Sequence, residues 1–259
     1  MEELRVSRDG PIATLTLNRP DKHNAITVAM WEALPGVLAP LASDAAVRVL
    51  VLRGAGEEAF ASGADISEFG LVRNSSASAR AYSALVAAAE RTLADFPKPT
   101  LALIHGFCIG GGLELALSCD FRWTDPRGRF GITAARLGIV YGMAATRRLA
   151  RLVGPSHARD LLFSGRLVEA EEARAMGLVN RVCPPADLDQ AAQAYVRTLA
   201  QQAPLSQRGA KAMLQHLAGE GTMTDRDIAA FIEAAYESAD YREGVRAFLA
   251  RRPARFEGR

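Results

Sequence analysis

The 259-residue chain has little of what marks several large classes of protein. Its three cysteines are an odd number without metal-ligand spacing, which predicts small buried residues in a reducing compartment rather than disulfides. No apolar run approaches the length of a membrane span, and the charged start Met1–Arg5 lacks the apolar core of a signal peptide. We therefore expect a cytoplasmic protein without a membrane partner.

An excess of charge of one sign is also missing. The 31 Lys and Arg residues nearly balance the 29 Asp and Glu residues, for a net charge of +2, which argues against a nucleic-acid partner. The four histidines have no spacing that suggests a metal site or a catalytic dyad. Neither a Gly-x-Ser-x-Gly elbow nor a P-loop is present. Hydrophobic content, by contrast, is an ordinary 49%, so a full globular core is available.

Short apolar segments with the character of strands recur through the first half of the chain. They cover residues 4–8, 12–17, 47–52, 100–104 and 121–124. The first two alternate in polarity around Asp9-Gly10, which is typical of a β-hairpin. The continuous apolar run at 47–52 predicts a strand covered on both faces. Helical patterns separate the later strands, so the sequence predicts the α/β class.

Helical periodicity begins early and dominates the end of the chain. Thr27 is a candidate N-cap for a helix to Leu41, which we expect Pro35-Gly36 to kink or break. A polar surface loop at 70–80 should lead into a helix over about 78–95. Later helices are predicted at 156–163, 169–176, 188–202, 205–218 and 224–236. We expect an α/β core over 1–190 and a C-terminal helical region over 191–259, whose apolar faces favour an oligomer.

The most informative stretch runs from Gly106 to Asp120. Three consecutive glycines lead directly into an apolar, helix-prone segment that carries one carboxylate, Glu114. The free N–H groups and positive dipole end at the start of a helix suit anionic oxygen. A carboxylate one turn from such a site suits acyl chemistry. The alternative is a glycine hinge before a buried helix, with Glu114 as a solvated residue.

Further short motifs stand in order along the chain. They are Asn18-Arg19-Pro20 with Asn24-Ala25, Phe60–Asp65, Gly110–Glu114 with Cys119-Asp120, Phe130-Gly131 with Leu137-Gly138, and Gly177–Asn180. Together they resemble the enoyl-CoA hydratase/isomerase superfamily, or crotonase family, over nearly the whole chain. The resemblance implies a crotonase-like spiral of ββα units followed by a helical C-terminal trimerisation region. It also implies a homotrimer or a dimer of trimers, an acyl-CoA substrate, and no cofactor beyond the coenzyme A of that substrate.

The resemblance also implies a catalytic site. The backbone N–H groups of Ala64 and Gly111 would polarise the thioester carbonyl, as an oxyanion hole does. Glu114 matches the first of two glutamates that hydratases of the family use as acid and base. The second glutamate aligns with Ala134, which cannot carry a proton. Its polar neighbours Thr133 and Tyr141 are candidates for accessory roles, Tyr141 either as an acid or as part of the wall.

Coenzyme A would lie against two segments by the same resemblance. The implied contacts are Arg19, Lys22, Asn24, Ala25, Ala61, Ala64, Asp65, Ile66 and Gly111. The basic C-terminal segment from Arg242 to Arg259 either contacts phosphates or complements the dipole of its own helix.

These observations predict an acyl-CoA-processing enzyme, closest to an enoyl-CoA hydratase that acts on a 2-enoyl-CoA through an oxyanion hole and Glu114. Ala134 leaves two alternatives open. One is an isomerase or decarboxylase that uses a single carboxylate. The other is an acyl-CoA-binding homologue with weak catalysis.

Overall fold

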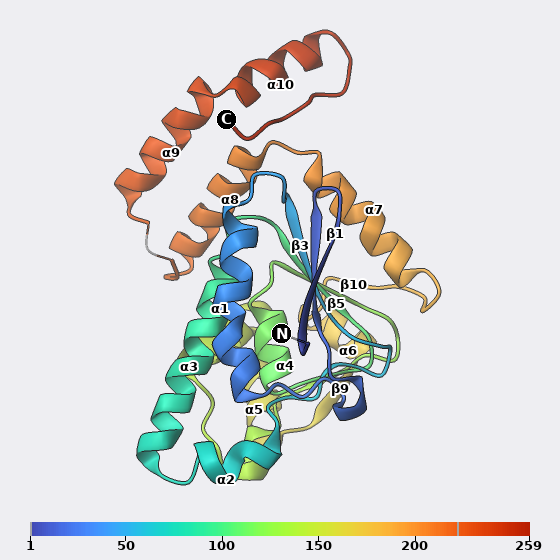
Figure 1. Cartoon of the computed structure of the whole chain (residues 1–259), viewed down its shortest axis with the longest axis vertical. Helices are drawn as coiled ribbons and strands as arrows, with labels where there is room; N and C mark the ends of the chain where they lie inside the picture. The colour runs from blue at the N-terminus through green and yellow to red at the C-terminus, as the bar shows by residue number, and fades with distance from the viewer. Residues whose placement is uncertain (1, 222) are drawn as a thin grey trace.

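A six-stranded sheet forms the centre of the computed structural model, which describes residues 2–221 and 223–259 (Figure 1). Its strands, in spatial order, are β1 (Leu4–Asp9), β2 (Ile12–Leu17), β3 (Val49–Gly54), β5 (Thr100–Ile104), β7 (Phe121–Thr124) and β10 (Arg181–Val182). The hairpin β1–β2 is antiparallel, as its sequence predicts, and all the other neighbours pair in parallel.

A second, four-stranded sheet carries the loops of the candidate site. Its strands are β4 (Ala59–Ala61), β6 (Phe107–Ile109), β8 (Arg129–Gly131) and β9 (Leu167–Glu169), and only the β8–β9 pair is antiparallel. Strands β4 and β6 each follow a strand of the first sheet, so each ββ unit turns from one sheet into the other. The predicted α/β class is confirmed.

Helices cover both faces of the six-stranded sheet. Helices α1 (Val28–Ser43) and α3 (Ser76–Ala94) lie on one side, and α7 (Leu188–Ala200) lies on the other (Figure 1). Strand β3 is buried at five of its six residues, which explains its continuous apolar run. The predicted boundary between residues 190 and 191 falls inside α7, which packs on this sheet.

Helix α1 departs from the sequence prediction, because it runs through Pro35 and Pro40 without a break. A proline costs a helix one hydrogen bond and some steric strain. Helix α1 buries an apolar stripe that includes Met30, Trp31 and Leu38, and such tertiary packing supplies most of a helix's stability. Of the predicted kink or break at Pro35-Gly36, the break is therefore wrong.

The remaining elements complete the body of the protein. They are the short turns η1 (Pro20–Lys22), η2 (Ile66–Glu68) and η3 (Thr133–Leu137) and the helices α2 (Phe69–Val72), α4 (Gly111–Leu117), α5 (Met143–Ser164) and α6 (Ala170–Ala175). The three cysteines are free and buried, as predicted. No helix in the described part of the chain is long and apolar enough to cross a membrane.

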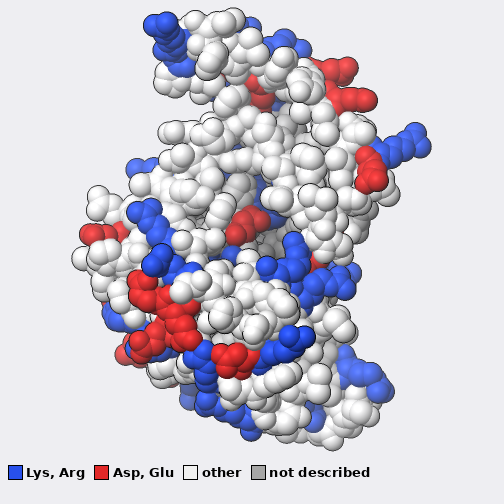
Figure 2. Space-filling view, turned by 180° about the vertical axis from the view of Figure 1, so that it is seen from behind, with Lys and Arg blue, Asp and Glu red and all other residues white. Residues whose placement is uncertain are grey.

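The C-terminal helices extend away from the sheets. Helix α8 (Pro204–Leu217) is followed by α9 (Asp225–Glu237) and α10 (Ala239–Leu249), and α9 packs on both of its neighbours (Figure 1). Large apolar side chains are exposed on these helices, at Leu214, Leu217, Ile232, Tyr236, Tyr241, Val245, Phe248 and Leu249. Seen from behind, the upper part of the molecule is largely uncharged away from its edges (Figure 2). The exposed apolar side chains of α8, α9 and α10 belong to the helical region whose apolar faces the sequence predicts.

Candidate active site

Two glycines set the position of helix α4. Gly110 has φ +52°, a conformation that favours glycine, and turns the chain from β6 into the helix. A Cβ on Gly112 would lie 2.5 Å from the carbonyl oxygen of Ala61, so only glycine lets α4 pack this closely on β4. The glycine stretch therefore brings the first turn of α4 against the loop after β4.

The backbone of Ala64 and Gly111 and the carboxyl group of Glu114 lie close together. A Cβ built on Gly111 would lie 3.7 Å from the Ala64 nitrogen and 3.7 Å from the Glu114 Oε2. The N–H of Ile26 donates to the Gly63 oxygen at 2.8 Å, and the N–H of Asp65 donates to the Ile26 oxygen at 2.9 Å. This parallel bridge turns the Ala64 N–H to the opposite side.

The N–H groups of Ala64 and Gly111 are left without a hydrogen-bond partner among residues 2–221 and 223–259. Two such neighbouring donors can bind one oxygen atom. They face a cavity of about 190 Å³. Its apolar wall includes Ile66, Phe69, Val86, Leu137, Ile139, Val140 and Met143. Its polar lining includes Arg73, Tyr82, Glu90, Glu114, Thr133 and Tyr141.

Glu114 is a carboxyl group whose pKa is raised. Burial, and after it the nearby charge of Glu90, raises the pKa of Glu114 from 4.5 to about 8. Glu90 lies on α3 and is 2% exposed, and burial raises its pKa as well, against the opposing charge of Arg148. The site therefore holds two neighbouring carboxyl groups, and the second comes from a helix that carries none of the motifs.

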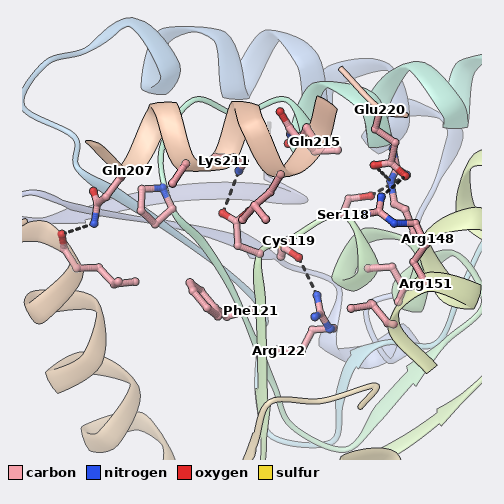
Figure 3. Close-up of a pocket in the computed structure, with 18 residues that line it drawn as sticks. Ser118, Cys119, Phe121, Arg122, Arg148, Arg151, Gln207, Lys211, Gln215 and Glu220 are labelled. Carbon is pink, nitrogen blue, oxygen red and sulfur yellow. Dashed lines mark hydrogen bonds and ion pairs between the residues drawn. The ribbon is translucent and has the colours of Figure 1, made fainter. Parts of the chain in front are cut away.

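Arg148, on α5, fixes the Glu90 carboxylate. Its Nη1 lies 3.2 Å from Glu90 Oε2 and donates to the Ser118 Oγ, also at 3.2 Å. Behind it, Glu220 lies 3.8 Å from the Arg148 Nε. The close-up of the adjoining pocket shows these two side chains pointing toward one another (Figure 3). The Glu90 Oε1 has no hydrogen-bond partner among the described residues.

Ala134 lines the cavity in the turn η3, so the position that the resemblance assigns to a second glutamate lies at the site and carries no carboxylate. Its neighbour Thr133 lines the same wall. The Tyr141 hydroxyl is buried beside the Glu114 carboxyl, without a well-aligned hydrogen bond to any described residue. Burial, followed by the charge of Glu114, holds the pKa of Tyr141 well above its usual value, so Tyr141 keeps its proton. Both accessory candidates therefore share the cavity of Glu114.

Several residues implied to contact coenzyme A hold the site loop together. The Arg19 guanidinium lies 2.9 Å from Asp65 and 3.1 Å from Glu3, and it donates to the Ala25 oxygen at 2.7 Å. Asn24 is fully buried and donates to the Ala59 oxygen at 2.7 Å. These side chains tie the segment after β2 to strand β4 and to the loop that follows it.

The other implied coenzyme A contacts differ in exposure. Ala61 and Ala25 are buried, so only their backbone could contact a ligand. Lys22 is exposed and forms no ion pair with any described residue. Ile66 is 62% exposed and lines the cavity. The structure thus brings Ile66, Ala64 and Gly111 to the cavity, and leaves Lys22 on the surface.

The sequence prediction missed Glu90, Arg73 and Trp31, which all line the cavity. Glu90 could have been found, because it lies on the buried stripe of α3 with Tyr82 and Val86, at positions where an amphipathic helix carries apolar residues. A carboxylate in such a stripe requires a specific reason.

Comparison with known proteins identifies the family of the chain. The family model for enoyl-CoA hydratase/isomerase matches residues 7–259. The chain is 35% identical over 261 residues to the crotonyl-CoA hydratase of Syntrophomonas wolfei, covering 98% of both chains. It is 32% identical over 252 residues to the short-chain-enoyl-CoA hydratase of Clostridium acetobutylicum, covering 95% of this chain and 94% of that protein.

Solved structures agree as well. An enoyl-CoA hydratase/carnithine racemase from Magnetospirillum magneticum superposes with a TM-score of 0.95 at 36% identity, covering 100% of this chain and 97% of that one. The resemblance inferred from the short motifs is therefore confirmed, together with the crotonase fold. The chain belongs to the enoyl-CoA hydratase/isomerase family, and it is an enzyme of that family.

Proposed function

We propose that the protein is an enoyl-CoA hydratase, which adds water across the 2,3-double bond of a 2-enoyl-CoA. The observation that carries the proposal is the meeting of Ala64, Gly111 and Glu114 around one point, with both backbone N–H groups unpartnered in the described chain. The two N–H groups would bind the thioester oxygen, and negative charge on that oxygen would strengthen both hydrogen bonds in the transition state.

One carboxylate can complete the addition in two steps. Ionised Glu114 takes a proton from water, and the hydroxide oxygen bonds to the β-carbon while the π electrons move to the thioester oxygen. The protonated Glu114 then gives its proton to the α-carbon as the enolate collapses. Water is consumed, and Glu114 returns to its ionised state. A pKa of about 8 suits a group that must act first as base and then as acid near neutral pH.

Ala134 favours a second candidate. A site with a single carboxylate could instead move a proton between two carbons of the substrate, or protonate the enolate left by decarboxylation. Either reaction would use the same oxyanion hole and the same Glu114. A homologue that binds acyl-CoA with little turnover is the third candidate, since Ala134 removes the family's second acid.

Incubation with crotonyl-CoA and longer 2-enoyl-CoA thioesters separates these candidates. Hydration removes the absorbance of the conjugated thioester and adds the mass of one water, whereas isomerisation changes no mass. Decarboxylation of a suitable acyl-CoA loses carbon dioxide. Glu114→Gln should bind the thioester and not hydrate it. Binding by the wild type with no added water for any 2-enoyl-CoA would reject the hydratase proposal.

A further inference from the structure

One cation of the cavity has no counter-ion. The Arg73 guanidinium carbon lies 4.2 Å from the ring centre of Phe69 and 4.4 Å from that of Tyr82, so the cation is held between two aromatic rings. It forms no ion pair with any carboxylate in residues 2–221 and 223–259. Its Nε is buried without a hydrogen-bond partner in that same part of the chain. Arg73 therefore lines the cavity as a preorganised cation beside the Tyr82 hydroxyl, with no carboxylate of the described residues to accept from it.

Two more buried donors of the same cavity lack well-aligned acceptors. The Trp31 Nε1 and the Tyr141 hydroxyl form no well-aligned hydrogen bond among the described residues, although the Tyr82 hydroxyl lies near the first and the Glu114 carboxyl near the second. Trp31 is 1% exposed. The Trp31 ring lies beside the oxyanion site, with its Cζ2 3.1 Å from a Cβ built on Gly111. Buried donors without acceptors are costly, and three in one cavity indicate an acceptor-rich ligand.

The charges of the cavity point to an anion. Of its two carboxyl groups, Glu90 is already paired with Arg148 at 3.2 Å. The pKa of Glu114 is about 8, so that group is mostly neutral at pH 7. The Arg73 side chain, which is half-buried, then has no ionised carboxylate within ion-pair distance among the described residues. A neutral alkyl chain would strip water from its guanidinium and offer it no acceptor, which costs affinity.

We propose that the acyl group of the substrate carries a carboxylate, bound by the guanidinium of Arg73 with help from the Trp31 and Tyr141 donors. This inference rests on the proposed function, since it takes the cavity as the acyl site of a coenzyme A thioester. A planar guanidinium can hold a carboxylate through two parallel hydrogen bonds, which a lysine cannot reproduce. The substrate class is then the mono-CoA thioester of an unsaturated dicarboxylic acid.

Binding of saturated thioesters tests this without any turnover. The dicarboxylic series from malonyl-CoA to adipyl-CoA is measured by calorimetry beside neutral isosteres, in which an isopropyl group replaces the terminal carboxylate. We expect at least one member to bind more tightly than its isostere by about tenfold or more. Arg73→Met should remove this preference while the variant still binds the neutral thioesters. Arg73→Lys should keep part of it.

Arg80→Met, at an exposed arginine of α3, is the matched control and should keep the full preference. Binding of the neutral thioesters to each variant also shows that it is folded. Neutral thioesters that bind well while no dicarboxylic member is preferred would overturn this inference and leave the proposed function standing. A preference that survives in Arg73→Met would likewise overturn it. If no thioester binds at all, both proposals fail.

Discussion

Replacing Glu90 by Gln should make the enzyme faster at low pH, although Glu90 does not touch the reacting atoms in the proposed mechanism. The charge of Glu90 is the second cause, after burial, that raises the pKa of Glu114 to about 8. Glutamine keeps the shape and removes the charge. Burial remains, so the pKa of Glu114 should fall but stay above its ordinary value of 4.5.

The size of the effect follows from the two charges. At an effective dielectric constant of 20, like charges on two neighbouring side chains repel by about 3 kcal/mol, or about two pKa units. Arg148 lies 3.2 Å from Glu90 and offsets part of this repulsion. We therefore expect Glu90→Gln to lower the pKa of Glu114 by about one unit. At pH 6.5 the ionised fraction of Glu114 then rises from about 3% to about 24%. Because Glu114 with a lower pKa is a weaker base, the rate gains less than this eightfold rise in ionised fraction. We expect a gain of about threefold in rate at pH 6.5.

The assay is the pH dependence of kcat/KM for hydration, because this parameter reports groups of the free enzyme. The kcat/KM of the wild type should rise with pH up to about 8, the pKa of Glu114. The Glu90→Gln curve should rise at lower pH and cross the wild-type curve. It should exceed the wild type at pH 6.5 and fall below it at pH 9, where both are ionised and the variant is the weaker base.

Glu220→Gln is the matched control, because Glu220 also faces Arg148, at 3.8 Å, but does not line the site cavity. Its curve should coincide with that of the wild type. The reasoning is refuted if Glu90→Gln folds and binds thioester yet lowers the rate by the same factor at every pH. That result would mean that Glu90 takes part in the chemistry directly.

Three further predictions concern stability, catalysis and assembly. Since the pKa of Glu114 is higher when folded (about 8) than its ordinary 4.5, the free energy of unfolding should fall as pH rises between these values. The free energy of unfolding, measured in urea, should thus be higher for Glu114→Gln than for the wild type by a few kcal/mol at pH 9 and equal to it near pH 4. Equal free energies of unfolding at pH 9 would contradict this. Ala134→Glu should raise hydration by on the order of 10²–10⁴, and Ala134→Glu with Glu114→Gln should be inactive; a folded, ligand-binding Ala134→Glu with no gain would point to different chemistry. We propose a trimer or a dimer of trimers, because the C-terminal helices expose many apolar side chains, and sedimentation as a monomer at micromolar concentration would count against it.

The sequence predicted most of the elements, because their patterns are local. The hairpin β1–β2, the buried strand β5 and the glycine-led helix α4 appear where periodicity and turn residues place them. Helix α1 shows the limit of local rules, since burial of residues such as Trp31 outweighs the cost of Pro35. Propensity is a weak prior that tertiary packing overrides.

The part of the site that carries motifs was predictable, and the part that carries none was not. Ala64, Gly111 and Glu114 lie in recognisable stretches, and the structure brings them together. Glu90 and Arg73 come from segments without a motif, and Arg73 lies in a stretch expected to be a surface loop. Arg19 is the opposite case. As a basic residue beside a turn it suggests a phosphate contact in the sequence, whereas in the structure it pairs with Asp65 at 2.9 Å.

The central claim is that Glu114 moves the proton of an added water to the α-carbon. The most direct measurement is the reaction of crotonyl-CoA and glutaconyl-CoA in heavy water at pH 8, with the product examined by NMR and mass spectrometry. The account predicts that the wild type forms a 3-hydroxyacyl-CoA with one deuterium on the α-carbon. A folded, ligand-binding Glu114→Gln variant should form no 3-hydroxyacyl-CoA. Equal hydration by that variant, or a wild type that binds both thioesters and hydrates neither, would contradict it.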